Sequence, residues 1–281
     1  MATITHTDIK SDFTIQLSPP IYLNPNKKYE AALLSVNLYN SIPNITEENN
    51  IFKYSTDNGK TWKIITLNKG SYEIQAINDE IQRQMIINGD YDAENNKFYL
   101  TLSADIAELK SVIDITNETY LVDFNVENSI GHTLGFFPEE TETNRYFHKK
   151  IGYGYNKSHN IVDITKINLV LVNIDIISGS YVNRNQSPCI YSFDPYKVPP
   201  GYKLDERPNP ALIFYPVNRA NIHSLRIWLT DQNNKTVDFR GEKITIKIYI
   251  REKLNIKQEI IKAIKNQNIY NSNSNSNNDY H

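Results

Sequence analysis

The stretch that decides the fold is residues 241–251, Gly-Glu-Lys-Ile-Thr-Ile-Lys-Ile-Tyr-Ile-Arg, in which isoleucine alternates with polar residues. Successive side chains of a β-strand point to opposite faces, so this alternation predicts a strand with one buried face and one solvated face. Residues 223–229, His-Ser-Leu-Arg-Ile-Trp-Leu, alternate in the same way, and the segment between the two is rich in turn-forming residues. We therefore expect an antiparallel hairpin whose two strands complete a β-sandwich.

Further strands are predicted upstream, where apolar residues alternate with polar ones or β-branched residues dominate. The run at 161–177 is long enough for two short strands or one long bent strand, and Pro19 and Pro20 are expected to stop the first strand. The predicted strands cover residues 12–17, 29–39, 51–55, 61–67, 97–102, 119–124 and 161–177. This pattern predicts an all-β fold.

One helix is predicted in the body of the chain, over residues 72–87. Its apolar residues recur at three- and four-residue spacing, and Ser71 is placed to cap its N-terminus. A second, amphipathic helix is predicted at 252–269, after which residues 271–278 consist only of Asn and Ser. Such a low-complexity segment cannot bury a core, so we expect a disordered tail.

Three segments are predicted to be irregular. Residues 128–136 favour a short helix or a tight turn, residues 138–159 a long polar surface connection, and residues 187–216 an ordered loop rich in Pro and Tyr.

The composition excludes several classes of protein. The 281 residues carry a formal net charge of -2, which gives no bulk attraction to nucleic acid or anionic membrane. The single cysteine, Cys189, rules out an internal disulfide and zinc sites built on cysteine clusters. No segment approaches the roughly 20 apolar residues of a membrane span, and the N-terminal residues lack the pattern of a secretory signal. We expect a soluble protein made in a reducing compartment.

Residues 55–62, Ser-Thr-Asp-Asn-Gly-Lys-Thr-Trp, match the Asp-box turn of sialidases. The turn itself has a physical basis, because Asp57 can accept bonds from nearby backbone amides, Gly59 can take a positive φ and Trp62 can pack beneath. A sialidase needs several copies, one per propeller blade, and this chain has one. A structural hairpin is therefore favoured over glycosidase activity.

The remaining candidates for chemistry are incomplete. Asp90, Asp92 and Glu94 alternate as in a calcium loop, but Asn95 stands where the loop needs Gly and Thr101 where it needs Glu. The six histidines have no partner at zinc-binding spacing, and Cys189 has no activating neighbour in the sequence. We expect no enzyme activity, no cofactor and no metal.

The chain instead offers surface residues that suit an interface. Tyr181, Tyr191, Tyr196 and Tyr202 surround a Pro-rich segment, where they either pack the loop onto the sandwich or contact another subunit, because Tyr offers a large contact area at low entropic cost. Asp238 and Arg240 flank Phe239 and either contact a neighbouring loop or cap the turn of their own hairpin.

Several phrases taken together resemble the minor capsid, or penton, proteins of virophages and Polinton-like (Maverick) elements. The resemblance covers most of residues 10–251. Its phrases lie at residues 24–34, 39–45, 49–54, 70–74, 129–136, 179–181, 199–203, 215–218 and 231–245; examples are Ser-Ile-Gly-His-Thr-Leu-Gly-Phe and Pro-Pro-Gly-Tyr-Lys.

The resemblance implies a jelly-roll β-sandwich that assembles as a homopentamer at the fivefold vertices of an icosahedral capsid. The implied partner is a double-jelly-roll major capsid protein, and the implied location is the virion, assembled inside the host cell. The resemblance carries over no catalytic residues.

The fold expected is thus an all-β jelly-roll sandwich with a mixed α/β insertion and a short C-terminal helix. Residues 1–252 would form the capsid domain, with a possible inserted subdomain at about 50–150, and residues 253–281 the terminal helix and tail. The alternative function is a carbohydrate- or receptor-binding β-sandwich, whose partner would be a host-surface receptor or glycan.

Overall fold

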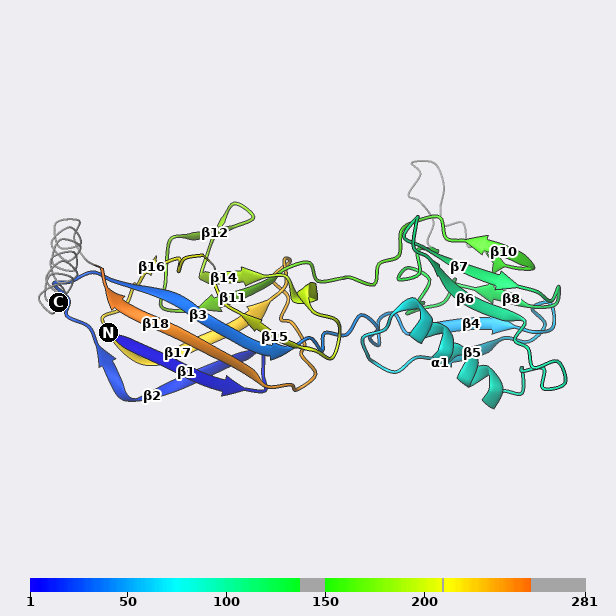
Figure 1. Ribbon diagram of the computed structural model, residues 1–281, viewed down its shortest axis with the longest axis horizontal. Helices are drawn as coiled ribbons and strands as arrows, with labels where there is room; N and C mark the ends of the chain where they lie inside the picture. The colour runs from blue at the N-terminus through cyan, green and yellow to red at the C-terminus, as the bar shows by residue number, and fades with distance from the viewer. Residues whose placement is uncertain (137–149, 209, 254–281) are drawn as a thin grey trace, which may run out of the picture.

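The computed structural model describes residues 1–136, 150–208 and 210–253. The predicted C-terminal helix and tail therefore lie outside the described residues, apart from Glu252 and Lys253. Figure 1 shows two lobes joined by two stretches of chain. The first lobe contains β1 to β3 and β11 to β18, and the second contains β4 to β10 and α1.

The first lobe is a sandwich of two antiparallel sheets, hereafter the sandwich. One sheet has the order β1 (Ala2–Asp8), β18 (Ile244–Glu252), β3 (Tyr29–Tyr39) and β15 (Lys203–Glu206), with the short β16 (Tyr215–Pro216) also paired to β3. The other has the order β14 (Cys189–Phe193), β11 (Val170–Ile174), β17 (Asn221–Thr230) and β2 (Asp12–Tyr22).

The path of the chain through these eight strands is that of a jelly roll. Along the chain the strands are β1, β2, β3, β11, β14, β15, β17 and β18, and all the neighbours within each sheet are antiparallel. The chain changes sheet at every step except from β11 to β14, and the first and last strands lie side by side. Two sheets of four strands wound in this way make the double Greek key of a jelly roll. The predicted all-β jelly-roll fold is confirmed.

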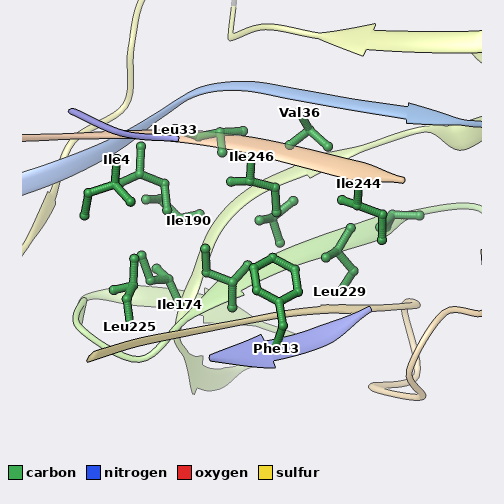
Figure 2. Packing of buried hydrophobic residues seen from close by; sticks show 14 of the residues in the cluster. Ile4, Phe13, Leu33, Val36, Ile174, Ile190, Leu225, Leu229, Ile244 and Ile246 are labelled. Carbon is green, nitrogen blue, oxygen red and sulfur yellow. The ribbon is translucent and has the colours of Figure 1, made fainter. Parts of the chain in front are cut away.

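The core lies between the two sheets. Figure 2 shows Leu33, Val36, Ile244 and Ile246 on one side of it, with Leu225 and Leu229 on the other. The isoleucines of β18 at 244, 246, 248 and 250 are all buried, as their alternation predicts.

The prediction that the two strands within residues 223–251 pair with each other as a hairpin is wrong. β17 pairs with β2 and β11, whereas β18 pairs with β1 and β3 in the opposite sheet. The segment 231–243 crosses from one sheet to the other and inserts Val237 and Phe239, both buried, into the core. Alternation predicts which face of a strand is buried, but it contains no information about the neighbouring strand, and two strands facing one core from opposite sides show the same pattern.

The second lobe is built from chain between β3 and β11. One sheet has the order β5 (Lys63–Thr66), β4 (Ile51–Ser55), β8 (Leu121–Asp123) and β9 (Lys150–Ile151); the other has β10 (Gly154–Lys157), β7 (Lys110–Ile115) and β6 (Leu100–Asp105). The helix α1 (Ile74–Ile87) packs against β6, and its buried residues include Ile77, Ile81 and Met85. These side chains belong to a hydrophobic cluster separate from that of the sandwich.

Some predicted elements differ in their details. The helix is confirmed, but Glu73 occupies its N-cap position, and Ser71 instead donates a hydrogen bond of 2.5 Å to the carbonyl of Ile42. β2 continues through Pro19 and Pro20 as an edge strand, and its pairing with β17 is interrupted beside them because proline has no N–H to donate.

The irregular segments contain more structure than predicted. β9 and β10 lie within the predicted connection at 138–159, of which residues 138–149 lie outside the described residues. β14, β15, β16 and the short 3-10 helix Pro195–Lys197 lie within the predicted loop at 187–216. Residues 161–177 contain the single strand β11, residues 128–136 form turns, and β1 and β7 had no counterpart among the predicted strands.

Candidate functional site

The junction between the lobes is the region where the chain leaves the sandwich after β3 and returns to it before β11. Asn44, which is buried, holds the two passing stretches together. Its side-chain amide donates to the carbonyls of Tyr72 (2.7 Å) and Ile164 (3.1 Å), and its side-chain oxygen accepts from the Tyr72 N–H (2.8 Å). A side chain of the outgoing chain thus binds both the returning chain and the segment before α1.

Asp238 and Arg240 lie at this junction, on the segment that crosses between the sheets. The Asp238 carboxylate accepts a bond of 2.7 Å from the Arg240 N–H and forms an ion pair of 2.6 Å with Lys69 of the second lobe. Burial alone would raise the pKa of Asp238, but the Lys69 ammonium and the Arg240 N–H outweigh it and lower that pKa below its ordinary value. Asp238 therefore both caps its own turn and links the two lobes of one chain.

Tyr196 and Tyr202 also lie near the junction. Burial raises the pKa of Tyr196, whose hydroxyl interacts with the backbone of Ile167 on the returning chain. Tyr202 is 65% exposed, and its carbonyl accepts a 2.9 Å bond from the N–H of Asn40, the residue after β3. Four of the six predicted interface residues are thus brought to one end of the sandwich.

The other two tyrosines lie elsewhere. Tyr191, on β14, packs partly against the core, and its hydroxyl donates to the Glu206 carboxylate at 3.3 Å. Tyr181 is 71% exposed on β12 (Ser180–Val182), which pairs with β13 (Asn185–Ser187) in a hairpin. No pattern in the sequence distinguishes the half-buried Tyr191 from the exposed Tyr181. Asn44 and Lys69, which complete the junction, have no sequence signal either, because each acts through residues distant in the chain.

The Asp-box segment forms the predicted hairpin turn between β4 and β5. Asp57 accepts bonds from the N–H (2.9 Å) and hydroxyl (2.5 Å) of Thr61, and with the Ser55 hydroxyl these lower the pKa of Asp57 to about 2. Gly59 has a φ of 78°, and Trp62 lies directly below it. The ammonium groups of Lys53 and Lys150 lie 4.8 and 5.2 Å from the Trp62 ring centre. The motif thus forms a stable turn that packs on the sheet.

The carboxylates of the calcium-like segment bind protein groups. Asp90 accepts bonds of 2.5 Å from the buried Tyr54 hydroxyl and from the Lys63 ammonium. Asp92 accepts from the Tyr99 hydroxyl (2.5 Å) and from Asn95, which together lower the pKa of Asp92 to about 2. These bonds occupy oxygens that a cation would need.

Within the described residues, no three His, Cys, Asp or Glu side chains gather as a metal site requires. Cys189 is buried, and burial raises the pKa of its thiol, which disfavours the reactive thiolate. Among the residues that the structure describes, no helix is both long enough and apolar enough to cross a membrane.

No known family model matches the sequence, and no curated protein matches it. Among solved structures, the chain is similar to a crystal structure of the mavirus penton protein. The sequence identity is 12% and the TM-score 0.47, over 89% of this chain and 99% of that one.

Proposed function

We propose that this protein is a structural capsid protein of the minor, or penton, type, which forms homopentamers at the fivefold vertices of an icosahedral capsid. Its partner in the shell would be a double-jelly-roll major capsid protein, and its location the virion. The virophage and Polinton-like relationship is part of the proposal and comes from the sequence phrases that resemble those pentons.

The observation that carries the proposal is the strand order of the sandwich, β1-β18-β3-β15 facing β14-β11-β17-β2. Jelly rolls of this kind occur in viral capsid proteins and in lectins, so the fold alone leaves both classes open.

We also propose that the two lobes are two domains, the second one inserted between β3 and β11. Each lobe has its own hydrophobic cluster, and a separate core is the physical requirement for a domain. Inserted at the junction end, the second domain leaves the other faces of the sandwich free for contacts within a ring.

The solution mass of the purified protein, measured by light scattering and followed by negative-stain imaging, tests the proposed function. A species of five times the 32.5 kDa chain with fivefold rings is expected. A contact repeated five times around a ring leaves no free edges and gains from its closure, so the pentamer should persist on dilution. A monomer in solution and in the presence of major capsid protein would contradict the proposal.

A second candidate, a carbohydrate- or receptor-binding sandwich, is favoured by one observation. Tyr181 is 71% exposed on the β12–β13 hairpin, and a ring displayed in this way suits stacking against a sugar. A glycan array would support this function by reproducible binding that Tyr181→Ala abolishes and that Tyr155→Ala, a change at another exposed tyrosine, does not.

A further inference from the structure

A cleft of about 510 Å³ lies at the end of the sandwich away from the second lobe, between the turn that precedes β3 and the chain from β16 to β17. Among the described residues that line it, none is acidic and four are cationic: Lys27, Lys28, Arg219 and Lys253. The whole chain has a formal net charge of -2, so this positive charge is a local feature.

Two of the four cations are neutralised by carboxylates outside the cleft lining. Lys27 pairs with Glu252 and Arg219 with Asp175, each at 2.9 Å. Lys28 and Lys253 form no ion pair within the described part of the chain. A backbone bond of 2.8 Å from the Lys253 N–H to the Lys28 carbonyl holds these two lysines together. Two adjacent positive charges repel each other, so an anionic group between them is stabilised.

The rest of the cleft suits a peptide better than a free anion or a nucleic acid. Leu23, Pro25, Tyr29, Pro216 and Val217 give it an apolar wall. Nucleic acids need a track of cations and stacking aromatic rings. This cleft instead has one half-buried tyrosine and two lysines without an ion pair among the described residues. A short segment with both acidic and apolar side chains fits this lining.

We propose that the cleft binds the acidic segment 138–142, Pro-Glu-Glu-Thr-Glu, of a second copy of this chain. The segment has three glutamates in four residues, at 139, 140 and 142, a density found nowhere else in the sequence. Phe137 directly precedes it and supplies an apolar side chain for the wall of the cleft. This inference rests on the self-association that the proposed function requires, and it identifies the residues through which two copies of the chain would bind each other.

The segment cannot reach the cleft of its own chain. It lies between Phe136 and Lys150 of the second lobe, and a loop of that length anchored at both ends extends at most about 24 Å, half of its contour. β3 runs from Tyr29 in the cleft to Tyr39 at the junction, and its eleven residues alone span about 37 Å. The contact must therefore join two molecules through different surfaces, which is the heterologous geometry that closes a ring.

The direct test uses a fluorescein-labelled synthetic peptide of residues 136–145 titrated with the full-length protein, with anisotropy as the readout. We expect saturable binding that the double change Lys28→Glu and Lys253→Glu weakens about tenfold or more. The matched control, Lys10→Glu with Lys235→Glu, changes two exposed lysines outside the cleft and should leave the affinity unchanged. Absence of saturable binding, or equal loss in the control, overturns the proposal.

Competing occupants give different results in the same assay. Two further probes are a scrambled peptide of the same composition and a single-stranded oligothymidine. If either bound as tightly as the peptide of residues 136–145, and with the same dependence on the two lysines, the cleft would be an unspecific anion site and the assignment would be overturned. Removal of residues 254–281, which directly follow the cleft, should leave the peptide affinity unchanged. A tenfold gain would identify that segment as the occupant instead.

A charge exchange in the full-length protein separates this contact from the proposed function. One variant reverses the charges of the cleft lysines, and the other reverses those of the acidic segment by Glu139→Lys, Glu140→Lys and Glu142→Lys. Each variant alone should self-associate more weakly. An equimolar mixture of the two should form mixed assemblies again. If the protein is a pentamer and neither charge reversal changes its mass, the proposed contact is wrong, but the capsid function is not contradicted. Peptide binding by a protein that never assembles supports the contact and contradicts the capsid function.

Discussion

At the scale of single residues, the junction depends on Asn44. Its amide makes three bonds to backbone groups of Tyr72 and Ile164, and an alanine would leave these partly buried groups without partners. We expect Asn44→Ala to destabilise the second lobe by about 2–4 kcal/mol, because each buried polar group left unpaired costs about 1–3 kcal/mol.

Urea unfolding can measure this loss, because the two tryptophans of the chain report on different lobes. Trp62 lies in the second lobe and Trp228 on β17 of the sandwich, so a Trp228→Phe background leaves Trp62 as the reporter. Asn233→Ala, a change at an exposed asparagine, is the control. An unchanged Trp62 transition in Asn44→Ala would show that the amide does not hold the lobe.

Residue-level prediction from the sequence succeeded only where an interaction is local. The Asp-box turn was predicted because Asp57, Gly59 and Thr61 act within one turn. The double role of Asp238 shows the limit: its bond to Arg240 is local and was one of the two readings, but its ion pair with Lys69 joins residues far apart in the chain.

At the scale of elements, the crossing segment 231–243 closes the sandwich. Phe239 is 1% exposed within the core, and the Ser41 hydroxyl donates a 2.6 Å bond to its carbonyl. We expect Phe239→Ala to lower the free energy of unfolding by about 3–5 kcal/mol, the usual cost of deleting a buried aromatic ring.

The measurement is urea unfolding followed by Trp228 fluorescence in a Trp62→Phe background, together with the solution mass. Thr236→Ala, at an exposed position of the same segment, should change neither. If Phe239→Ala left both the unfolding midpoint and the mass untouched, the segment would not anchor the sandwich.

Elements were predictable where burial is one-sided and regular. The ends of β3 match the predicted strand at 29–39, and α1 begins two residues after the predicted start. β7 was missed because its residues Ser111, Val112 and Ile113 are buried in succession and show no alternation. Strand partners are set by contacts between distant segments, so the same periodicity that identified β17 and β18 paired them wrongly.

At the scale of the whole molecule, one exposed ion pair, Lys69 with Asp238, joins the two lobes; it is the only one between them among the described residues. Because the folded-state pKa of Asp238 is below its ordinary value of about 4, the pair contributes at higher pH and is lost as the pH falls through that lowered pKa. Both side chains are more than a third exposed, so the contribution to stability is at most about 1 kcal/mol.

We therefore expect Asp238→Asn to change overall stability little but to widen the range of distances between the lobes. Distances between spin labels placed on the two lobes measure this range. Lowering the pH from 7 to about 3, or raising the salt to about 1 M, should widen it in the unmodified protein and add little in Asp238→Asn. Asp12→Asn, which breaks a similarly exposed ion pair within the sandwich, should leave the range unchanged.

The pairing of β1 with β18 has a consequence for synthesis on the ribosome. β18 is central in its sheet and lies between β1 and β3, yet it is made more than two hundred residues after them. That sheet cannot be completed before residue 252 is translated. Until then the apolar faces of the first strands stay exposed, a condition that favours aggregation. The second lobe is continuous in sequence between β3 and β11, and the nascent chain can fold it while the sandwich is still unfinished.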